Sequence, residues 1–204
     1  FADLIAGRDI SDLDRIVLWD IRLPRLAVGV LVGAALAVSG VVMQGLFRNP
    51  LADPGIVGVS AGAGLGAISA IILGAYLPAS ILAWVGNSLV AVAAFLGGWT
   101  SVLLLYRVST RGGQTSVATM LLAGIALGAL SGAVSGVLVY MADDQQLRDL
   151  TFWGMGSLAG ATWTKAATAA PIILISVFTA QFLARALNGM AMGEAVAHHM
   201  GISV

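Results

Sequence analysis

The sequence contains no cysteine and has few charged residues. Ten Lys or Arg and ten Asp or Glu occur among 204 residues, so charged residues make up 10% and the formal net charge is 0. The lack of cysteine excludes disulfide bonds, thiolate zinc sites and a cysteine nucleophile. A neutral chain also lacks the basic surface that nucleic-acid binding requires. Because soluble domains carry about 25% charged residues, this composition, with 59% hydrophobic residues, indicates a membrane protein.

Long charge-free runs account for most of the chain. At 1.5 Å per residue the first run reaches about 33 Å, enough to cross the hydrocarbon core of about 30 Å. Pro78 divides the longest run in two. Since lipid offers no partner to unpaired backbone groups, such runs form helices. The predicted fold class is therefore all-α, a polytopic transmembrane bundle with spans at 26–47, 56–77, 81–106, 116–141 and 166–184.

Three shorter segments differ from the spans. Residues 1–20 hold several acidic residues and no long apolar stretch, so they do not resemble a signal peptide. We expect residue 1, which is not Met, to be a cut end, and the chain to stop abruptly at residue 204. Residues 150–164 are rich in Gly and aromatics and predict an interfacial or re-entrant helix, with Trp153 and Trp163 at headgroup level. Residues 190–200 predict a short helix outside the membrane.

The distribution of Lys and Arg gives a first prediction of orientation. Alternating spans put 1–25, 78–80 and 142–165 on one face and 48–55, 107–115 and 185–204 on the other. The first face holds six Lys or Arg (8, 15, 22, 25, 148 and 165) and the second holds four (48, 107, 111 and 185). By the positive-inside rule the first face would be cytoplasmic.

Glycine recurs every four residues within the spans. The span 116–141 carries a stripe of Gly124, Gly128, Gly132 and Gly136, and the span before residue 77 repeats the spacing at 58, 62 and 66. Small residues at this spacing let helix backbones approach closely in lipid. The stripe therefore predicts close helix packing or the lining of a transport path.

One motif matches an enzyme signature. Residues 58–62 fit Gly-x-Ser-x-Gly, with Ser60 as the candidate nucleophile. That motif requires a strand-to-helix turn followed by an acid and a histidine. Here it opens an apolar run, and the two histidines, His198 and His199, follow the last span. An intramembrane serine hydrolase using Ser60 is therefore kept only as an alternative of another class.

Other sources of chemistry or energy are missing from the sequence. No phosphate-binding Gly-x-x-x-x-Gly-Lys-Ser/Thr loop is present, and no ionisable residue lies inside a span to relay protons or hold an ion. His198 and His199 would point about 100° apart on a helix, a poor pair for one metal. We therefore predict no catalytic residue, metal site or resident cofactor, and an energy source outside this chain.

A series of motifs runs along the whole chain. In order they are Arg22-Leu-Pro-Arg25, 33–40, Gln44, Asn49-Pro-Leu-Ala-Asp-Pro-Gly55, 58–64, 122–128, 152–158 and Gly193-Glu-Ala with Met200-Gly201. Together they resemble the permease family of bacterial importers for vitamin B12, ferric siderophores and haem. The resemblance implies ten helices per subunit, of which this chain would supply the second to the sixth.

The resemblance also implies a domain layout and an orientation. Residues 1–204 would form one partial permease domain. Its parts would be a periplasmic segment at 1–25, a transmembrane bundle at 26–189 and the start of a cytoplasmic coupling loop at 190–204. This orientation is opposite to the one that the charge count favours.

The resemblance further implies roles for individual residues. Arg22 and Arg25 match periplasmic arginines that meet acidic residues of the binding protein, as suits the directional pairing of Arg with carboxylates. Asn49, Pro50 and Leu51 match a cytoplasmic loop that narrows the exit of the path. Prolines at 50 and 54 would stiffen this loop.

Two further elements are assigned in the same way. Thr115 and Ser116 fall near a second constriction. Gly193, Glu194 and Gly201 match the coupling element that seats in a cleft of the ATPase. The alternatives for these residues are ordinary turns and an amphipathic surface helix. For the whole chain, the alternative without a transport function is a purely structural helix bundle.

The implied partners follow from the family. They are an ATP-binding-cassette ATPase, a periplasmic substrate-binding protein, a second permease copy forming a homodimer, and the lipid of the bacterial inner membrane. Residues 143–149 with the following Leu-Thr-Phe-Trp most resemble haem permeases. Haem or a related iron chelate is thus the predicted cargo, with ferric siderophore or cobalamin as the alternative.

Overall fold

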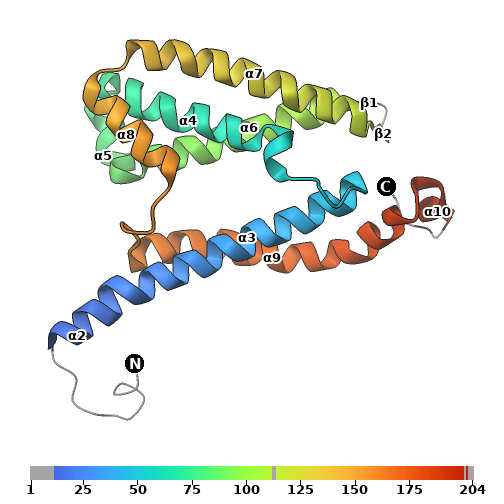
Figure 1. Cartoon of the computed structure of the whole chain (residues 1–204), viewed down its shortest axis with the longest axis horizontal. Helices are drawn as coiled ribbons and strands as arrows, with labels where there is room; N and C mark the ends of the chain where they lie inside the picture. The colour runs from blue at the N-terminus through green and yellow to red at the C-terminus, as the bar shows by residue number, and fades with distance from the viewer. Residues whose placement is uncertain (1–11, 112–113, 200, 202–204) are drawn as a thin grey trace. The chain divides into compact units, whose positions relative to one another are not determined.

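The computed structural model describes residues 12–111, 114–199 and 201, and almost all of them are helical (Figure 1). The all-α prediction is confirmed. The strands among the described residues form a two-stranded antiparallel ladder of β1 (Thr110–Arg111) and β2 (Gln114–Thr115). The chain forms two compact units, one of Phe1–Val42 with Ser157–Ser203 and one of Met43–Gly156. The prediction of a single domain over 1–204 stays a prediction.

Five helices within the described residues are long and apolar enough to cross a membrane, the number predicted from the charge-free runs. Mean hydropathy over an 18-residue stretch of each helix is 1.7 to 2.4. These five candidate spans are Asp12–Phe47, Val59–Tyr76, Leu89–Ser109, Val117–Met141 and Trp163–Ala191.

The first span begins earlier than predicted. Its helix comprises α2 (Asp12–Ile16), a π-helical segment (Val17–Arg22) and α3 (Leu23–Phe47) without interruption, although residues up to 25 were expected outside the bundle. Two acidic residues, Asp12 and Asp14, occupy the first turn, where the positive end of the helix dipole stabilises them. Pro24 lacks a backbone N–H and its ring would crowd the preceding turn. The wider π-helical turn directly before it relieves that conflict.

The unit that contains the N-terminal part also holds the last span. Here α9 (Trp163–Ala191) starts at Thr162, whose side chain accepts a hydrogen bond from the backbone N–H of Lys165. After Gly193, with φ 110°, the short helix α10 (Glu194–His199) follows. It corresponds to the short helix predicted at 190–200.

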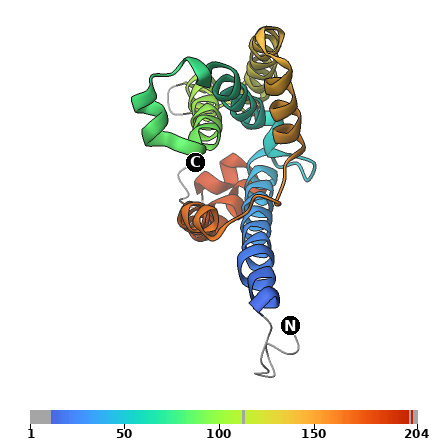
Figure 2. The ribbon, with the colours of Figure 1, turned by 90° about the vertical axis from the view of Figure 1, so that its left-hand side faces the viewer.

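The other unit is built on three helices, α4 (Val59–Leu73), α6 (Leu89–Ser109) and α7 (Val117–Met141), which Figure 2 views nearly end-on. Between α4 and α6 lie the 3-10 turn Gly74–Tyr76, α5 (Ala79–Val85) and a second 3-10 turn, Gly86–Ser88. The predicted helix 81–106 is therefore wrong at this point. Gly86 takes φ 50° and ψ −137°, a conformation that ends the helix and that favours glycine.

The helix predicted at 150–164 is also misplaced. The structure has α8 at Asp144–Met155 instead. Asp143 and Gln146 form a capping box that starts the helix before the aromatic residues. Gly156, with φ 70°, follows its last residue. The segment after it is irregular up to Trp163, so Trp153 and Trp163 belong to different helices.

Glycines bring α4 and α6 into backbone contact. A Cβ atom at Gly62 would lie 2.6 Å from the carbonyl oxygen of Gly97 and 2.6 Å from Cβ of Ser101. A Cβ at Gly66 would fall onto the carbonyl oxygen of Ala93 and lie 2.8 Å from its carbonyl carbon. Real Cβ contacts this short do not occur, so these two helices touch through positions that only glycine can fill. The stripe at 58, 62 and 66 thus forms the tight helix pair of this unit.

The stripe on α7 behaves differently. Gly124 is buried, and its carbonyl oxygen lies 3.2 Å from where a Cβ of Gly58 would stand. At Gly128, Gly132 and Gly136, however, no atom of the described residues comes within 4 Å of an added Cβ. The role predicted for these three positions, in helix packing or path lining, therefore stays a prediction. Equal spacing does not reveal which side of a helix has a neighbour.

Candidate functional site

The segment between α3 and α4, residues 48–58, forms a turn that we call the exit loop after the role predicted for it. Arg48 has φ 50°, unusual for a residue with a side chain. Asn49 donates its backbone N–H to Gln44 O at 3.2 Å, and its Oδ1 accepts from the N–H of Leu51 at 2.9 Å. Asn49 thereby holds the start of the turn, and Pro50 fixes the next backbone angle.

The second half of the exit loop is fixed by a carboxylate cap. Asp53 Oδ1 accepts from the backbone N–H of Gly55 at 2.6 Å and caps the 3-10 helix Pro54–Val57. The chain then enters α4 through Gly58, with φ 79° and ψ 4°. Leu51 at the tip of the loop is 83% exposed. The structure therefore presents a large apolar side chain on a rigid support.

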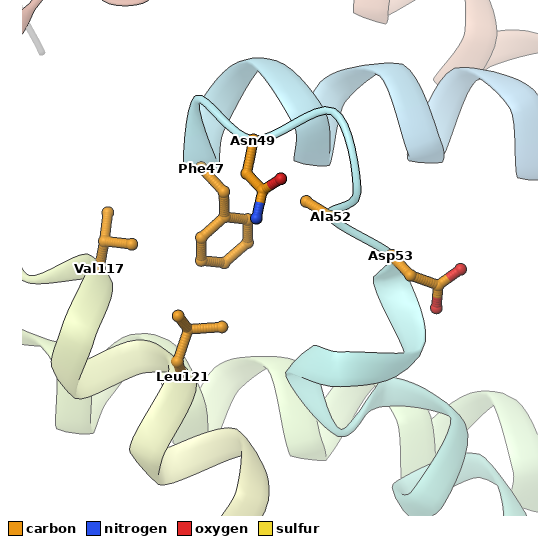
Figure 3. Close-up of a pocket in the computed structure, with 6 residues that line it drawn as sticks. All are labelled: Phe47, Asn49, Ala52, Asp53, Val117 and Leu121. Atoms are coloured by element: carbon orange, nitrogen blue, oxygen red, sulfur yellow. The ribbon is translucent and has the colours of Figure 1, made fainter.

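A small hollow lies beside this loop (Figure 3). It measures about 90 Å³, far below the roughly 300–1,000 Å³ of ligand pockets. Phe47, Val117 and Leu121 form its apolar wall, and loop residues form the rest. The hollow is therefore too small for a large cargo. Its lining residues are Phe47, Asn49, Ala52, Asp53, Val117 and Leu121.

The turn between α6 and α7 lies at the same end of this unit. Thr110 and Thr115 face each other across the β-ladder, with their hydroxyl oxygens 2.9 Å apart. Ser116 caps α7 by accepting from the backbone N–H of Thr119, and its own N–H donates to Ser109 O at 3.0 Å. Thr115 and Ser116, expected near a second constriction, thus hold the start of α7.

The other unit places the two candidate docking arginines on one helix. Arg22 is exposed, and Arg25 donates from Nη2 to the carbonyl oxygen of Ala159 at 3.2 Å. Nearby, Trp163 donates from Nε1 to Trp19 O at 2.8 Å, with ring centroids 5.9 Å apart. Arg25 therefore also fastens the segment before α9 to the first helix, which the sequence did not predict.

The predicted coupling residues lie at the start of α10 and on both sides of it. Gly193 and Gly201 have φ of 110° and 74°, a region that favours glycine. The carbonyl oxygen of Gly193 accepts from the backbone N–H of Ala197 at 2.9 Å, so the glycine starts the short helix. Glu194 is its first residue. The side chain of Glu194 lies outside what the structure describes.

The surroundings of Ser60 argue against a serine nucleophile. Ser60 lies in the first turn of α4, which follows a 3-10 helix and not a strand, so the strand-to-helix elbow of hydrolases is missing. Among the described residues no hydrogen bond joins Ser60 to a histidine, and no group of three or more His, Asp or Glu side chains could hold a metal.

Sequence reasoning missed one polar residue of this region. Ser101 is buried in α6, and its hydroxyl donates to Gly58 O at 3.0 Å. The pair Gly97 and Ser101 shows the four-residue spacing of small residues that marks a helix contact. That spacing was visible in the sequence, but the partner 43 positions away was not.

Comparison with known proteins gives consistent matches. The model of the FecCD transport family matches residues 1–204. The chain is 45% identical over 188 residues to the hemin transport system permease protein HmuU of Yersinia pestis, covering 92% of this chain and 55% of that protein. It is 39% identical over 195 residues to the cobalamin import system permease protein BtuC of Halobacterium salinarum, covering 96% of this chain and 50% of that protein.

Two further matches agree. The vitamin B12 import system permease protein BtuC of Escherichia coli O6:H1 is 37% identical over 200 residues, covering 98% of this chain and 58% of that protein. A solved structure, an inward-facing conformation of a metal-chelate type ABC transporter, superposes with a TM-score of 0.82 at 31% identity, covering 95% of this chain and 59% of that chain. This chain thus spans between half and three fifths of the length of these relatives.

Proposed function

Because the chain belongs to the FecCD transport family, we propose that it forms part of the membrane-spanning permease of a bacterial ATP-driven importer. The family match over the whole chain carries this proposal, and five apolar helices support it. In this function the chain does no chemistry of its own. A separate ATP-binding-cassette ATPase hydrolyses ATP, a periplasmic binding protein delivers the cargo, and a second permease copy completes the path in the inner membrane.

Haem, or a related iron chelate, is the cargo that we propose. The hemin permease of Yersinia pestis shares more identity with this chain than the two cobalamin permeases do, 45% against 39% and 37%. The resemblance of residues 143–149 to haem permeases also favours haem. Cobalamin is the second candidate, since cobalamin permeases match 96% to 98% of the chain. Ferric siderophore is an alternative of the same kind.

The path would run along surfaces that this chain leaves open. Gly128, Gly132 and Gly136 on α7 face no described residue of the chain, so they can lie against cargo or against the second copy. Leu51, exposed on the exit loop, would narrow the cytoplasmic end. Pro50 and the Asn49 hydrogen bonds keep this side chain on a stiff support.

Arg22 and Arg25 are proposed to receive the binding protein. An exposed guanidinium forms directional, charge-assisted pairs with carboxylates. Such pairs at the rim of an interface mainly govern the association rate and its salt dependence. Arg25 would dock while it also holds Ala159 O, whereas Arg22 is exposed and makes no such contact among the described residues.

Reversing both charges, Arg22→Glu with Arg25→Glu, is expected to weaken binding-protein association by about tenfold or more at low salt, because attraction becomes repulsion. The remaining affinity should depend less on salt. Surface plasmon resonance on the complete transporter across a salt series measures both effects. Arg15→Glu, at the same end of the unit, is the matched control and should change affinity little. Wild-type affinity at every salt concentration in the double variant would rule out the docking role.

The cargo is tested by uptake. The complete permease, reconstituted with its ATPase and binding protein, is offered haem, cobalamin and a ferric siderophore at equal concentrations. We expect ATP-dependent accumulation of haem and at least about tenfold less of the other two, since a binding site commonly discriminates by more than 1.4 kcal/mol. Preferential uptake of cobalamin would select the second candidate and contradict haem.

A further inference from the structure

One buried hydroxyl links the exit loop to a neighbouring helix. Ser101 is 6% exposed and lies near the middle of α6, whose one charged residue is Arg107 in the last turn. Its Oγ donates to the carbonyl oxygen of Gly58 at 3.0 Å. The hydroxyls of Thr100 and Ser109 on the same helix donate to carbonyls of α6 itself, at Leu96 and Leu105. Ser101 therefore differs from these neighbours in reaching another segment.

Its partner, Gly58, is the residue at which the exit loop becomes α4. The carbonyl oxygen of Gly58 also accepts from the backbone N–H of Gly62 at 3.0 Å. A Cβ at Gly58 would lie 3.2 Å from Gly124 O on α7 and 3.6 Å from Ser101 Oγ. Three helices thus meet at this one backbone position, and the φ of 79° leaves it to glycine.

The hydrogen bonds that order the loop itself are local. Asn49 bonds to Gln44 and Leu51, and Asp53 bonds to Gly55. Among the hydrogen bonds that the structure describes for residues 49–58, the bond from Ser101 joins them to a distant helix. Val57 adds apolar packing against Leu105 and Met120, but apolar contact is not directional.

We propose that Ser101 is a positioning residue for transport, which sets where the exit loop sits against α6 and α7. The inference rests on the proposed function, in which this loop narrows the cytoplasmic exit. Without the hydroxyl, the loop would keep its internal turn and its apolar contacts but would sample other positions relative to α6. The carbonyl of Gly58 would keep its bond from Gly62, so the fold should survive.

The test places a single thiol on the loop. The chain contains no cysteine, so Leu51→Cys introduces the one reactive site within residues 1–204, and cysteines elsewhere in the complete permease are replaced by serine. The complete transporter in nanodiscs is labelled with a hydrophilic maleimide, with and without ATP and vanadate. Labelling in the Leu51→Cys background is expected to change with nucleotide.

Adding Ser101→Ala should change the nucleotide-free labelling rate about three- to tenfold, the equilibrium shift that the loss of one hydrogen bond produces. Ser109→Ala is the matched control. It removes an equally buried hydroxyl from the same helix, one that bonds only within that helix. It should leave the rate within about 1.5-fold, because the hydrogen bonds of this hydroxyl go to Leu105 O and Tyr106 O and not to the loop.

Two results would overturn the inference, and they are distinguishable. An unchanged rate in Ser101→Ala, with the nucleotide response intact, refutes the positioning role and leaves the proposed function standing. If the labelling rate of Leu51→Cys does not respond to nucleotide even when Ser101 is retained, the exit role of the loop is refuted, and the inference with it. If Ser101→Ala assembles poorly, Ser101→Cys keeps a weaker donor and is read by hydrogen–deuterium exchange over 49–57. Faster exchange than in the wild type supports the inference, and equal exchange overturns it.

Discussion

Gly66→Ala is expected to destabilise the permease by about 3 kcal/mol or more, at the upper end of what overpacking costs, and to leave little folded protein. The added methyl group would fall onto the carbonyl oxygen of Ala93, with the carbonyl carbon 2.8 Å away. Both atoms are backbone, so no side chain can rotate to make room. The helices α4 and α6 would have to separate, and the packing that holds them in lipid would be lost. Thermal unfolding of the purified permease in detergent measures the change.

The same helix offers a control of opposite sign. Gly64 lies two residues away on α4, and no described atom comes within 4 Å of an added Cβ there. Gly64→Ala should therefore stabilise the helix, by up to about 1 kcal/mol, because alanine restricts the unfolded chain and favours helix. Equal melting temperatures for the two variants would contradict the backbone contact between α4 and α6.

The spans were predictable because charge is sparse. Charged residues mark the ends of the apolar runs, so the number of helices followed from composition and length. The exact boundaries did not. Arg22 and Arg25 suggested that the first span begins at residue 26, yet charged side chains are tolerated where a helix projects beyond the hydrocarbon core. The break at Gly86 depends on one positive φ that an apolar sequence does not reveal.

The glycines show a second limit of the sequence. Stripes on α4 and α7 have the same four-residue spacing, but only the former meets a close backbone neighbour over its length. Spacing identifies a helix face able to pack, whereas the neighbour is set by the tertiary arrangement. The link from Ser101 to Gly58 likewise joins residues far apart in the sequence. The exit loop was predictable as a turn because Asn49, Pro50 and Pro54 act locally.

Glu194→Lys is expected to uncouple transport from ATP hydrolysis. In the proposed function, a separate ATPase supplies the driving force, and the sequence carries no phosphate loop and no Asp, Glu, Lys, Arg or His within the predicted spans. We propose that the segment from Gly193 to Gly201, with the helix α10, makes the contact with this ATPase. A carboxylate at the start of a helix is stabilised there by about 0.3–1 kcal/mol and accepts hydrogen bonds from a partner. A lysine would reverse both effects, while membrane insertion and binding-protein docking should persist.

The number of cargo molecules imported per ATP hydrolysed, measured in proteoliposomes that hold the complete transporter, tests directly whether this chain is driven by a separate ATPase. We expect uptake in the wild type to stop without ATP. We also expect Glu194→Lys to lower the ratio at least about tenfold, because a charged contact at an interface is reversed. The matched charge change Arg185→Glu, at an exposed position of α9, should preserve the ratio. Uptake without ATP, or a wild-type ratio in Glu194→Lys, would contradict the proposed coupling to an ATPase.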